Sequence, residues 1–199
     1  MIVRKLFKYE MSHRVDKAYT RRCAYNTHGH SYKLELGFRS NDPDQAMMVV
    51  DFSLIKKYIG PFVDSFDHSH MLWTNAGDVE IDFFMENNER WITAPFSSTA
   101  EMQAAMFYIY SQYAIDMMRS EKLGKNFNTE TTVSFARVHE TDTGYAEVNI
   151  SDLKDAGWYR WFEQCNLSKI VFSPVIMGEW PPYFRKFYNK LIKTHYDTV

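Results

Sequence analysis

The sequence predicts an α+β fold, in which two helices pack on one face of a four-stranded antiparallel sheet. Apolar and polar side chains alternate over residues 2–15 and 28–39, and this period of two is typical of half-buried strands. Residues 131–141 are rich in β-branched and aromatic side chains, and after a turn at 142–144 residues 145–150 return as their partner strand. Residues 54–66 and 102–117 instead show the apolar spacing of helices. The order of two strands, two helices and two strands favours helices gathered on one face of an antiparallel sheet.

The first two strands are expected to form a hairpin. Tyr9, Met11 and His13 share the apolar face of the first segment, while Lys8 and Glu10 point the other way. The second segment repeats this alternation, and the stretch between them, DKAYTRRCAYNT, is polar and loop-like. Two adjacent antiparallel strands joined by this loop are the simplest interpretation.

Both predicted helices carry start signals. Asp51 can cap the first helix, and the pair Gly60-Pro61 inside it predicts a kink or a break. Ser98 precedes Glu101 by three residues at the start of the second helix, which is the spacing of a capping box. The capping box offers a structural explanation for the polar residues at this helix start.

Two segments lie outside this core. Residues 73–97 show no clear periodicity and are expected to form a long loop with a short strand. Residues 151–199 contain two helical stretches around a short strand at KIVFSPV, with many aromatic side chains. We therefore divide the chain into a domain at 1–150 and an aromatic-rich C-terminal α/β extension at 151–199.

Composition excludes several classes of protein. The 199-residue chain has a formal net charge of −2, so nothing draws it as a whole to nucleic acid or to an anionic membrane. No stretch approaches the ~20 apolar residues of a membrane span, and the first residues show no apolar signal core. Two cysteines, Cys23 and Cys165, do not make a disulfide framework. We expect a cytoplasmic protein with free thiols.

A histidine pair is the sharpest local feature. His28 and His30 are two residues apart in a strand, so both imidazoles point to the same side, and Gly29 lets a ligand approach the backbone between them. A hairpin would bring His13, near the end of the preceding strand, beside them. Three neutral histidines leave one position of a tetrahedral zinc open, which is the catalytic pattern. The alternative is three ordinary polar strand residues.

Other side chains are candidates for proton transfer or ligand binding. Cys23 lies in the loop before His28, near two arginines that favour a thiolate, although a small side chain packed under a loop explains its position slightly better. Asp67 can orient the adjacent His68. Glu140, at a strand end, can accept two hydrogen bonds from an amidine-like edge such as that of a pterin. For these acidic and basic groups the alternative is a solvated side chain.

The other cysteine and histidines are given structural interpretations. Cys165 is expected to pack in the core, and His70 is expected to be solvated. His139 and His195 are expected to be structural.

Taken together, the motifs resemble the family of 6-pyruvoyl tetrahydropterin synthase and 6-carboxytetrahydropterin synthase. They cover about residues 1–150 in the family's order, and the combination is far more specific than any one motif. Along the chain they are MSH, CAYNTHGHSYKLEL, MMVVDFSLIKKYI, SFDHSHML, STAEMQAAMF and VHETDTGYAEV.

The resemblance implies a tunnelling fold (T-fold), an antiparallel sheet with two helices that oligomerises into barrels. It implies zinc held by His13, His28 and His30. A homo-oligomer with its pocket between subunits is therefore expected.

The resemblance also implies roles for the other candidates. The residues it assigns to proton transfer are Cys23, Asp67 and His68. Those it assigns to the pterin substrate are Glu140 and, as a weaker contact, Thr99.

The substrate class implied is 7,8-dihydroneopterin triphosphate. The first hypothesis is a zinc-dependent lyase that forms 6-carboxy-5,6,7,8-tetrahydropterin, with loss of triphosphate and acetaldehyde, in 7-deazaguanine and queuosine biosynthesis. The second is a 6-pyruvoyl-tetrahydropterin synthase, which eliminates triphosphate without cutting the carbon chain. The third is a non-catalytic, zinc-stabilised assembly protein of the same fold. The chain departs from the family pattern at Met71-Leu72 and in the four residues that separate Cys23 from His28.

Overall fold

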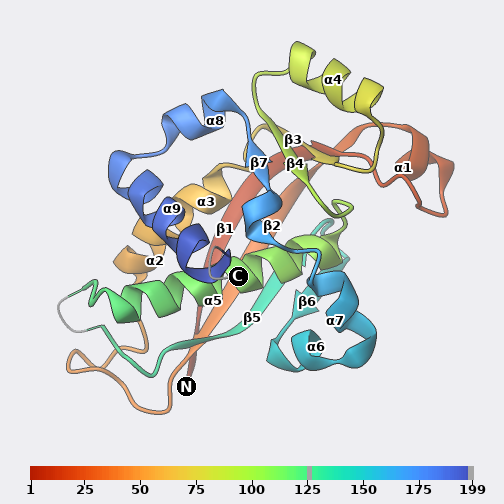
Figure 1. Cartoon of the computed structure of the whole chain (residues 1–199). Helices are drawn as coiled ribbons and strands as arrows, with labels where there is room; N and C mark the ends of the chain where they lie inside the picture. Colours follow the sequence, from red (N-terminus) through yellow and green to blue (C-terminus); the bar gives the residue numbers. More distant parts are fainter. Residues whose placement is uncertain (125–126, 197–199) are drawn as a thin grey trace.

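The computed structural model of the chain describes residues 1–124 and 127–196. Within these residues seven strands form one sheet in the order β6-β5-β2-β1-β3-β4-β7 (Figure 1). Four neighbouring strands are the predicted antiparallel ones: β1 (Ile2–His13), β2 (His28–Arg39), β5 (Thr132–His139) and β6 (Tyr145–Val148). The α+β fold and the two predicted hairpins are confirmed.

The predicted four-stranded sheet is wrong in size, because three more strands extend it beyond β1. The strands β3 (Ser69–Trp73) and β4 (Trp91–Ala94) run parallel to β1, and β7 (Val171–Phe172) is antiparallel to β4. Most residues of β3 and β4 are buried whichever way they point. Strands covered on both faces show no polar alternation, which is why the sequence pattern did not reveal them as a continuation of the sheet.

The segment predicted as a long loop contains β4 and also a helix, α4 (Asp78–Asn87). No residue of α4 is buried, so packing imposed no apolar spacing that could have identified it. A short helix, α1 (Arg21–Tyr25), lies in the connection between β1 and β2. Figure 1 shows α1 and α4 at the same end of the molecule, beyond the end of β1.

The helices of the predicted core lie on one side of the sheet (Figure 1). The first is broken at the predicted Gly60-Pro61 pair into α2 (Phe52–Tyr58) and α3 (Gly60–Asp64), and the Asp51 carboxylate caps α2 by accepting from Ser53 N–H. The second, α5 (Ala100–Ser120), lies across β5 and β6. This arrangement places the start of α5 near the end of the β1–β2 hairpin.

The C-terminal extension packs on this core. Its last helix, α9 (Pro182–Tyr196), lies against α5 and α2, which explains why α5 is buried on nearly all sides. Trp180 and Phe184 are buried in the same apolar cluster as β1 and β2. The remaining elements of the extension are α6 (Ile150–Lys154), α7 (Ala156–Phe162), the 3₁₀ turn η1 (Leu167–Lys169) and α8 (Pro174–Glu179).

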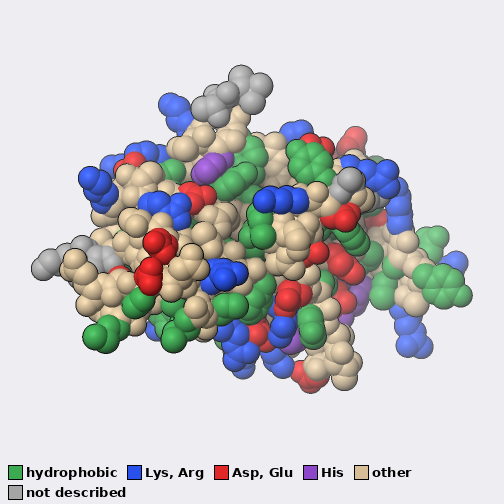
Figure 2. Space-filling model, turned by 90° about the horizontal axis from the view of Figure 1, so that it is seen from below, with side chains coloured by type: hydrophobic (Ala, Val, Ile, Leu, Met, Phe, Trp, Pro, Cys, Tyr) green, Lys and Arg blue, Asp and Glu red, His purple; other side chains and the backbone are tan. Residues whose placement is uncertain are grey.

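The surface carries charges of both signs. Figure 2 shows Lys and Arg side chains interspersed with Asp and Glu side chains over one face, in keeping with the formal net charge of −2. Among the described residues, no helix has both the length and the apolar character that a membrane span requires.

Candidate metal centre and active site

Three imidazoles meet at the end of the β1–β2 hairpin. The strand register pairs His13 with His28, and His30 follows on the same face of β2. Their ring centroids are 4.7 Å (His13–His28), 5.3 Å (His13–His30) and 5.1 Å (His28–His30) apart. One ring nitrogen of each lies within 4.8 Å of the others, so the three side chains could hold one metal ion.

Hydrogen bonds orient two of these imidazoles. His13 donates from Nδ1 to the Ser98 carbonyl oxygen at 2.6 Å, and His28 donates from Nδ1 to the Asn26 carbonyl oxygen at 3.0 Å. A carbonyl oxygen only accepts, so the neutral form of each ring carries its proton on Nδ1 and keeps a lone pair on Nε2. His30 Nε2 is buried without a hydrogen-bond partner among the described residues. Three available nitrogens, one of them buried and unpartnered, fit a metal ion.

Burial keeps two of the rings neutral. The pKa of His13 is lowered to about 4, mainly by burial; the Ser98 carbonyl opposes this shift, and the neighbouring His28 and His30 add to it. Burial also lowers the pKa of His30, although the Glu140 carboxylate opposes this. Neutral imidazole is the form that binds metals.

A cavity of about 540 Å³ opens beside the imidazoles, and Cys23, Thr99 and Glu140 line it together with His28 and His30. Glu140 Oε1 lies 3.6 Å from His13 Nε2 and 3.8 Å from His30 Nε2. Five residues that the sequence singled out, from three separate motifs, therefore share one cavity.

The start of α5 differs from the predicted capping box. Thr99, not Ser98, is the N-cap, and its hydroxyl accepts from Met102 N–H at 3.4 Å. Ser98 is instead buried, with its carbonyl oxygen on His13, so Glu101 does not occupy the position that a capping box needs. Glu101 lines the cavity. Because the capping-box spacing already gave Glu101 a structural explanation, the sequence analysis did not name it as a substrate-binding candidate. The family motif that contains STAE was the signal that could have identified it.

Cys23 lies in the β1–β2 connection, half-buried, with its carbonyl oxygen accepting from Val15 N–H at 3.0 Å. The adjacent Arg14 forms an ion pair with Glu80 of α4. The loop that carries Cys23 is thus attached to the helix that the sequence did not predict.

Asp67 and His68 lie at a corner on the other side of β1. The Asp67 carboxylate accepts from His68 Nδ1 at 2.9 Å and from Glu10 N–H at 2.7 Å, and His68 N–H donates to the Glu10 carbonyl oxygen at 2.6 Å. Burial opposes ionisation of Asp67, but these two donors outweigh it and hold the pKa of this carboxyl below its ordinary value. His68 adopts a left-handed backbone with φ of 52°, a strained conformation that this double backbone contact holds in place.

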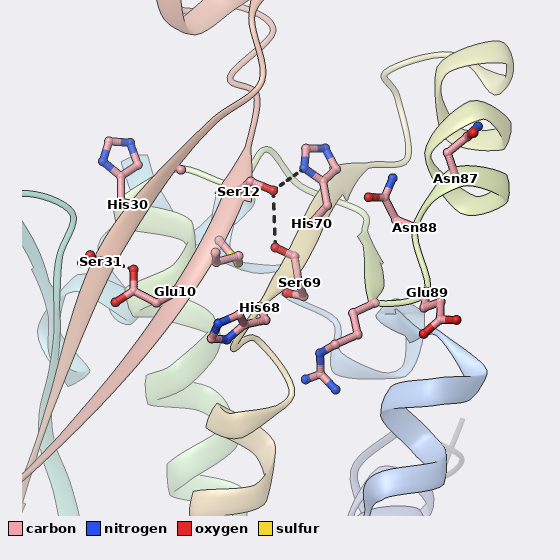
Figure 3. A pocket seen from close by; sticks show the side chains of 13 residues that line it. Glu10, Ser12, His30, Ser31, His68, Ser69, His70, Asn87, Asn88 and Glu89 are labelled. Carbon is pink, nitrogen blue, oxygen red and sulfur yellow. Dashed lines mark hydrogen bonds between the residues drawn. The ribbon is translucent and has the colours of Figure 1, made fainter.

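His68 lines a cavity of about 680 Å³ with Glu10, Ser31 and His70 (Figure 3). Cys23 does not line that cavity, and His68 does not line the one beside Cys23. Within one chain the structure therefore brings together Asp67 and His68, while His68 and Cys23 line two different cavities, both of which His30 also lines.

Comparison with known proteins decides the family. The profile described as 6-pyruvoyl tetrahydropterin synthase matches residues 2–151. The chain belongs to this family. Its fold agrees: solved structures of an uncharacterized Wolinella succinogenes protein (TM-score 0.57, 17% identity) and of the Plasmodium vivax 6-pyruvoyl tetrahydropterin synthase (TM-score 0.53, 19% identity) each cover 75% of this chain, and 98% and 99% of their own.

Relatives within the family differ in how far they match. The chain is 34% identical to a Helicobacter pylori 6-carboxy-5,6,7,8-tetrahydropterin synthase over 194 residues, covering 96% of this chain and 92% of the relative. The Aquifex aeolicus enzyme of the same name is 27% identical over 159 residues, covering 69% of this chain and 97% of its own length. The Helicobacter match therefore runs into the C-terminal extension, beyond the family profile.

The remaining histidines and the second cysteine are all packed. His70 was predicted to be solvated, and this is wrong: it is 4% exposed, stacks on Phe84 of α4 at 4.0 Å and hydrogen-bonds Ser12 Oγ at 2.7 Å. The unpredicted α4 covers it. The structural interpretations of the others are confirmed, by the His139–Glu35 hydrogen bond at 2.8 Å, the His195–Tyr113 stack at 3.7 Å and the burial of Cys165.

Proposed function

We propose that the chain is a zinc-dependent lyase that converts 7,8-dihydroneopterin triphosphate to 6-carboxy-5,6,7,8-tetrahydropterin, with loss of triphosphate and acetaldehyde, in 7-deazaguanine and queuosine biosynthesis. The observation that carries the proposal is the meeting of the three imidazoles of His13, His28 and His30 beside a cavity that Cys23 and Glu140 line. The name of the Helicobacter pylori relative, which aligns with 96% of the chain, favours the carboxy-forming reaction.

The metal ligands in this proposal are His13, His28 and His30. A three-histidine set leaves a coordination position open for substrate, and zinc bound there supplies a Lewis acid that acidifies the substrate's side chain. The burial that keeps His13 neutral at physiological pH also keeps its Nε2 available as a ligand.

Glu140 and Thr99 position the substrate. The Glu140 carboxylate accepts two hydrogen bonds from the amino group and ring N–H of the pterin, a charge-assisted and bidentate contact. Tyr32 O–H, which donates to Glu140 Oε1 at 3.4 Å, helps to hold the carboxylate in place. Glu101 and Thr99 line the same cavity and make weaker contacts.

Cys23 is the proposed base. Its thiolate takes a proton from a substrate side-chain carbon, and the electrons left behind delocalise into the pterin ring. The loop contacts through Val15 and Arg14 hold the Cys23 backbone close to the metal ligands.

The Asp67–His68 pair is proposed to return protons to the developing product in a neighbouring subunit. Asp67 fixes the His68 tautomer by accepting from Nδ1, which leaves Nε2 free for proton transfer. Because the pair does not line its own chain's Cys23 cavity, a homo-oligomer would complete each site with His68 from a second copy.

Incubation with 7,8-dihydroneopterin triphosphate and identification of the products by mass spectrometry tests the proposal. Acetaldehyde with 6-carboxytetrahydropterin is the expected result. A 6-pyruvoyl product would replace the proposal by the second hypothesis, 6-pyruvoyl-tetrahydropterin synthase. Metal-loaded protein with no turnover would favour the non-catalytic assembly protein.

A further inference from the structure

A chain of buried polar groups lies behind the metal ligand His13. Its members are the side chains of Tyr9 and Gln103 and the carbonyl group of Ser98, and these three residues and His13 are each no more than 1% exposed. They come from β1, from the first turns of α5 and from the residue before its cap. None of them lines the cavity beside Cys23, so none is placed to touch substrate.

The hydrogen bonds in this chain determine one another. Tyr9 O–H donates to Gln103 Oε1 at 2.7 Å, and Gln103 Nε2 donates to the Ser98 carbonyl oxygen at 3.3 Å and to Ser98 Oγ at 3.4 Å. The Ser98 carbonyl oxygen also accepts from His13 Nδ1 at 2.6 Å. If the Gln103 amide were flipped, its Oε1 would face the Ser98 carbonyl oxygen, and two acceptors would lie together without a hydrogen. Only one orientation of the Gln103 amide therefore gives each of these groups a hydrogen-bond partner.

Burial makes it costly to change which of these groups donate and which accept. It raises the pKa of Tyr9 well above its ordinary value, so the hydroxyl keeps its proton and stays a donor to Gln103. The Ser98 carbonyl uses both lone pairs, one for Gln103 and one for His13. An amide 0% exposed has no water to replace a lost partner.

We infer that Gln103 is a positioning residue for the metal site, which aims the Ser98 carbonyl at His13 Nδ1 and thereby keeps His13 Nε2 directed at the metal. The inference rests on the metal site of the proposed function and adds a residue that does not contact metal or substrate. The partners of a metal-binding histidine commonly change metal affinity by about 10- to 100-fold when they are removed.

The test is the dissociation constant of zinc, measured by competition with a chelator, for wild type and for Gln103→Leu. Gln103→Leu should bind zinc about tenfold more weakly, at the low end of that range because Gln103 acts through Ser98. The absorption spectrum of the cobalt-substituted protein should also shift, since the direction of one ligand changes. The matched control is Gln112→Leu on the same helix, whose amide contacts Asp116 and Val133 N–H instead.

A double variant separates positioning from stability. Gln103→Leu leaves the Tyr9 hydroxyl buried without an acceptor, whereas Tyr9→Phe/Gln103→Leu removes both polar partners and should recover much of the stability to urea. The Tyr9 and Tyr32 rings stack with their centroids 5.0 Å apart, and Tyr9→Phe keeps the ring that makes this contact. Zinc affinity should stay low in the double variant, because the Ser98 carbonyl still lacks the hydrogen bond from Gln103.

The outcomes are distinct. Three results would overturn the inference and leave the proposed function standing. The first is wild-type zinc affinity in folded Gln103→Leu. The others are a double variant that recovers zinc affinity together with stability, and a Gln112→Leu variant that loses as much affinity as Gln103→Leu. A wild-type chain that binds no divalent metal would overturn the proposed function, and the inference with it.

Discussion

The end of the β1–β2 hairpin and the corner before β3 both present histidines, but the two regions are built differently. At the hairpin, His13 is fully buried and its neighbours His28 and His30 face it across two paired strands. At the corner, the His68 side chain is 75% exposed and is held by the Asp67 carboxylate and by the backbone of Glu10.

The difference separates two kinds of chemistry. Burial at the hairpin favours neutral imidazoles, the form in which histidine binds a metal. Exposure at the corner leaves His68 Nε2 able to reach a group outside its own chain, while the ordered Asp67 keeps the ring oriented. In the proposed function the first region supplies all three metal ligands from one chain, and the second supplies a proton-transfer pair that does not line the cavity beside Cys23.

The largest effect is expected from His28→Ala. As-purified wild type should carry about one zinc per chain, and the variant should carry almost none, because two imidazoles bind far more weakly than three. Elemental analysis by mass spectrometry measures this. His68→Ala is the control from the corner and should keep its zinc; full zinc content in His28→Ala would break the comparison.

Cys23→Ala should lower turnover by about 10²- to 10⁴-fold, the contribution of a positioned proton-transfer group, while zinc content and fold stay unchanged. Steady-state kinetics with 7,8-dihydroneopterin triphosphate measures it. Cys165→Ala, which removes a buried thiol from the apolar core, should remain active. Equal behaviour of the two variants would show that Cys23 has no special role.

Mixing two inactive variants tests whether the corner serves a second subunit. Cys23→Ala and His68→Ala should each be nearly inactive, but hetero-oligomers co-expressed from both should regain activity well above either parent, because some sites combine an intact Cys23 with an intact His68. Activity of the doubly tagged, co-purified complex measures this. Failure to recover in a complex that does assemble would place both groups in the same subunit's site.

Glu140→Gln should weaken binding of a pterin ligand by about 1–3 kcal/mol, since it keeps the shape of the side chain but loses the charge that pairs with the pterin edge. Calorimetry with a non-reactive pterin measures the affinity. Glu101→Gln alters a second carboxylate of the same cavity and should lose less. The reverse ranking would move the anchor to Glu101.

The smallest effect concerns His70, which lies between the two regions. Burial, with smaller effects of His13 and Arg14, lowers the pKa of His70 to about 4, whereas an unfolded histidine has a pKa of about 6.5. Between these values the unfolded chain binds the extra proton, so stability falls as the pH drops from about 6.5 toward 4.

Wild type should therefore lose roughly 1–2 kcal/mol more stability than His70→Asn between pH 7 and pH 5. Urea unfolding in the presence of a chelator measures this without metal release. Parallel losses would show that His70 is not held neutral by burial.

The sequence alone determined the hairpin and the meeting of its three histidines, because both depend on local geometry. Side chains two apart in a strand share a face, and a hairpin pairs the end of one strand with the start of the next, so His13, His28 and His30 had to meet once the strands were recognised. The helix break at Gly60-Pro61 was equally local. Cys23 and Glu140 were candidates from their own surroundings, the family resemblance assigned their roles, and both line the cavity beside the histidines.

Only the tertiary structure decided the rest, because burial and partners come from segments far apart in the chain. The sheet extends through β3, β4 and β7, whose short sequences carry no alternation, and α4 covers His70 without burying any residue of its own. The Ser98 carbonyl accepts from His13, 85 residues away, and Thr99 rather than Ser98 is the N-cap of α5. His68 and Cys23 line different cavities, and the spacing of these residues along the chain could not have predicted this.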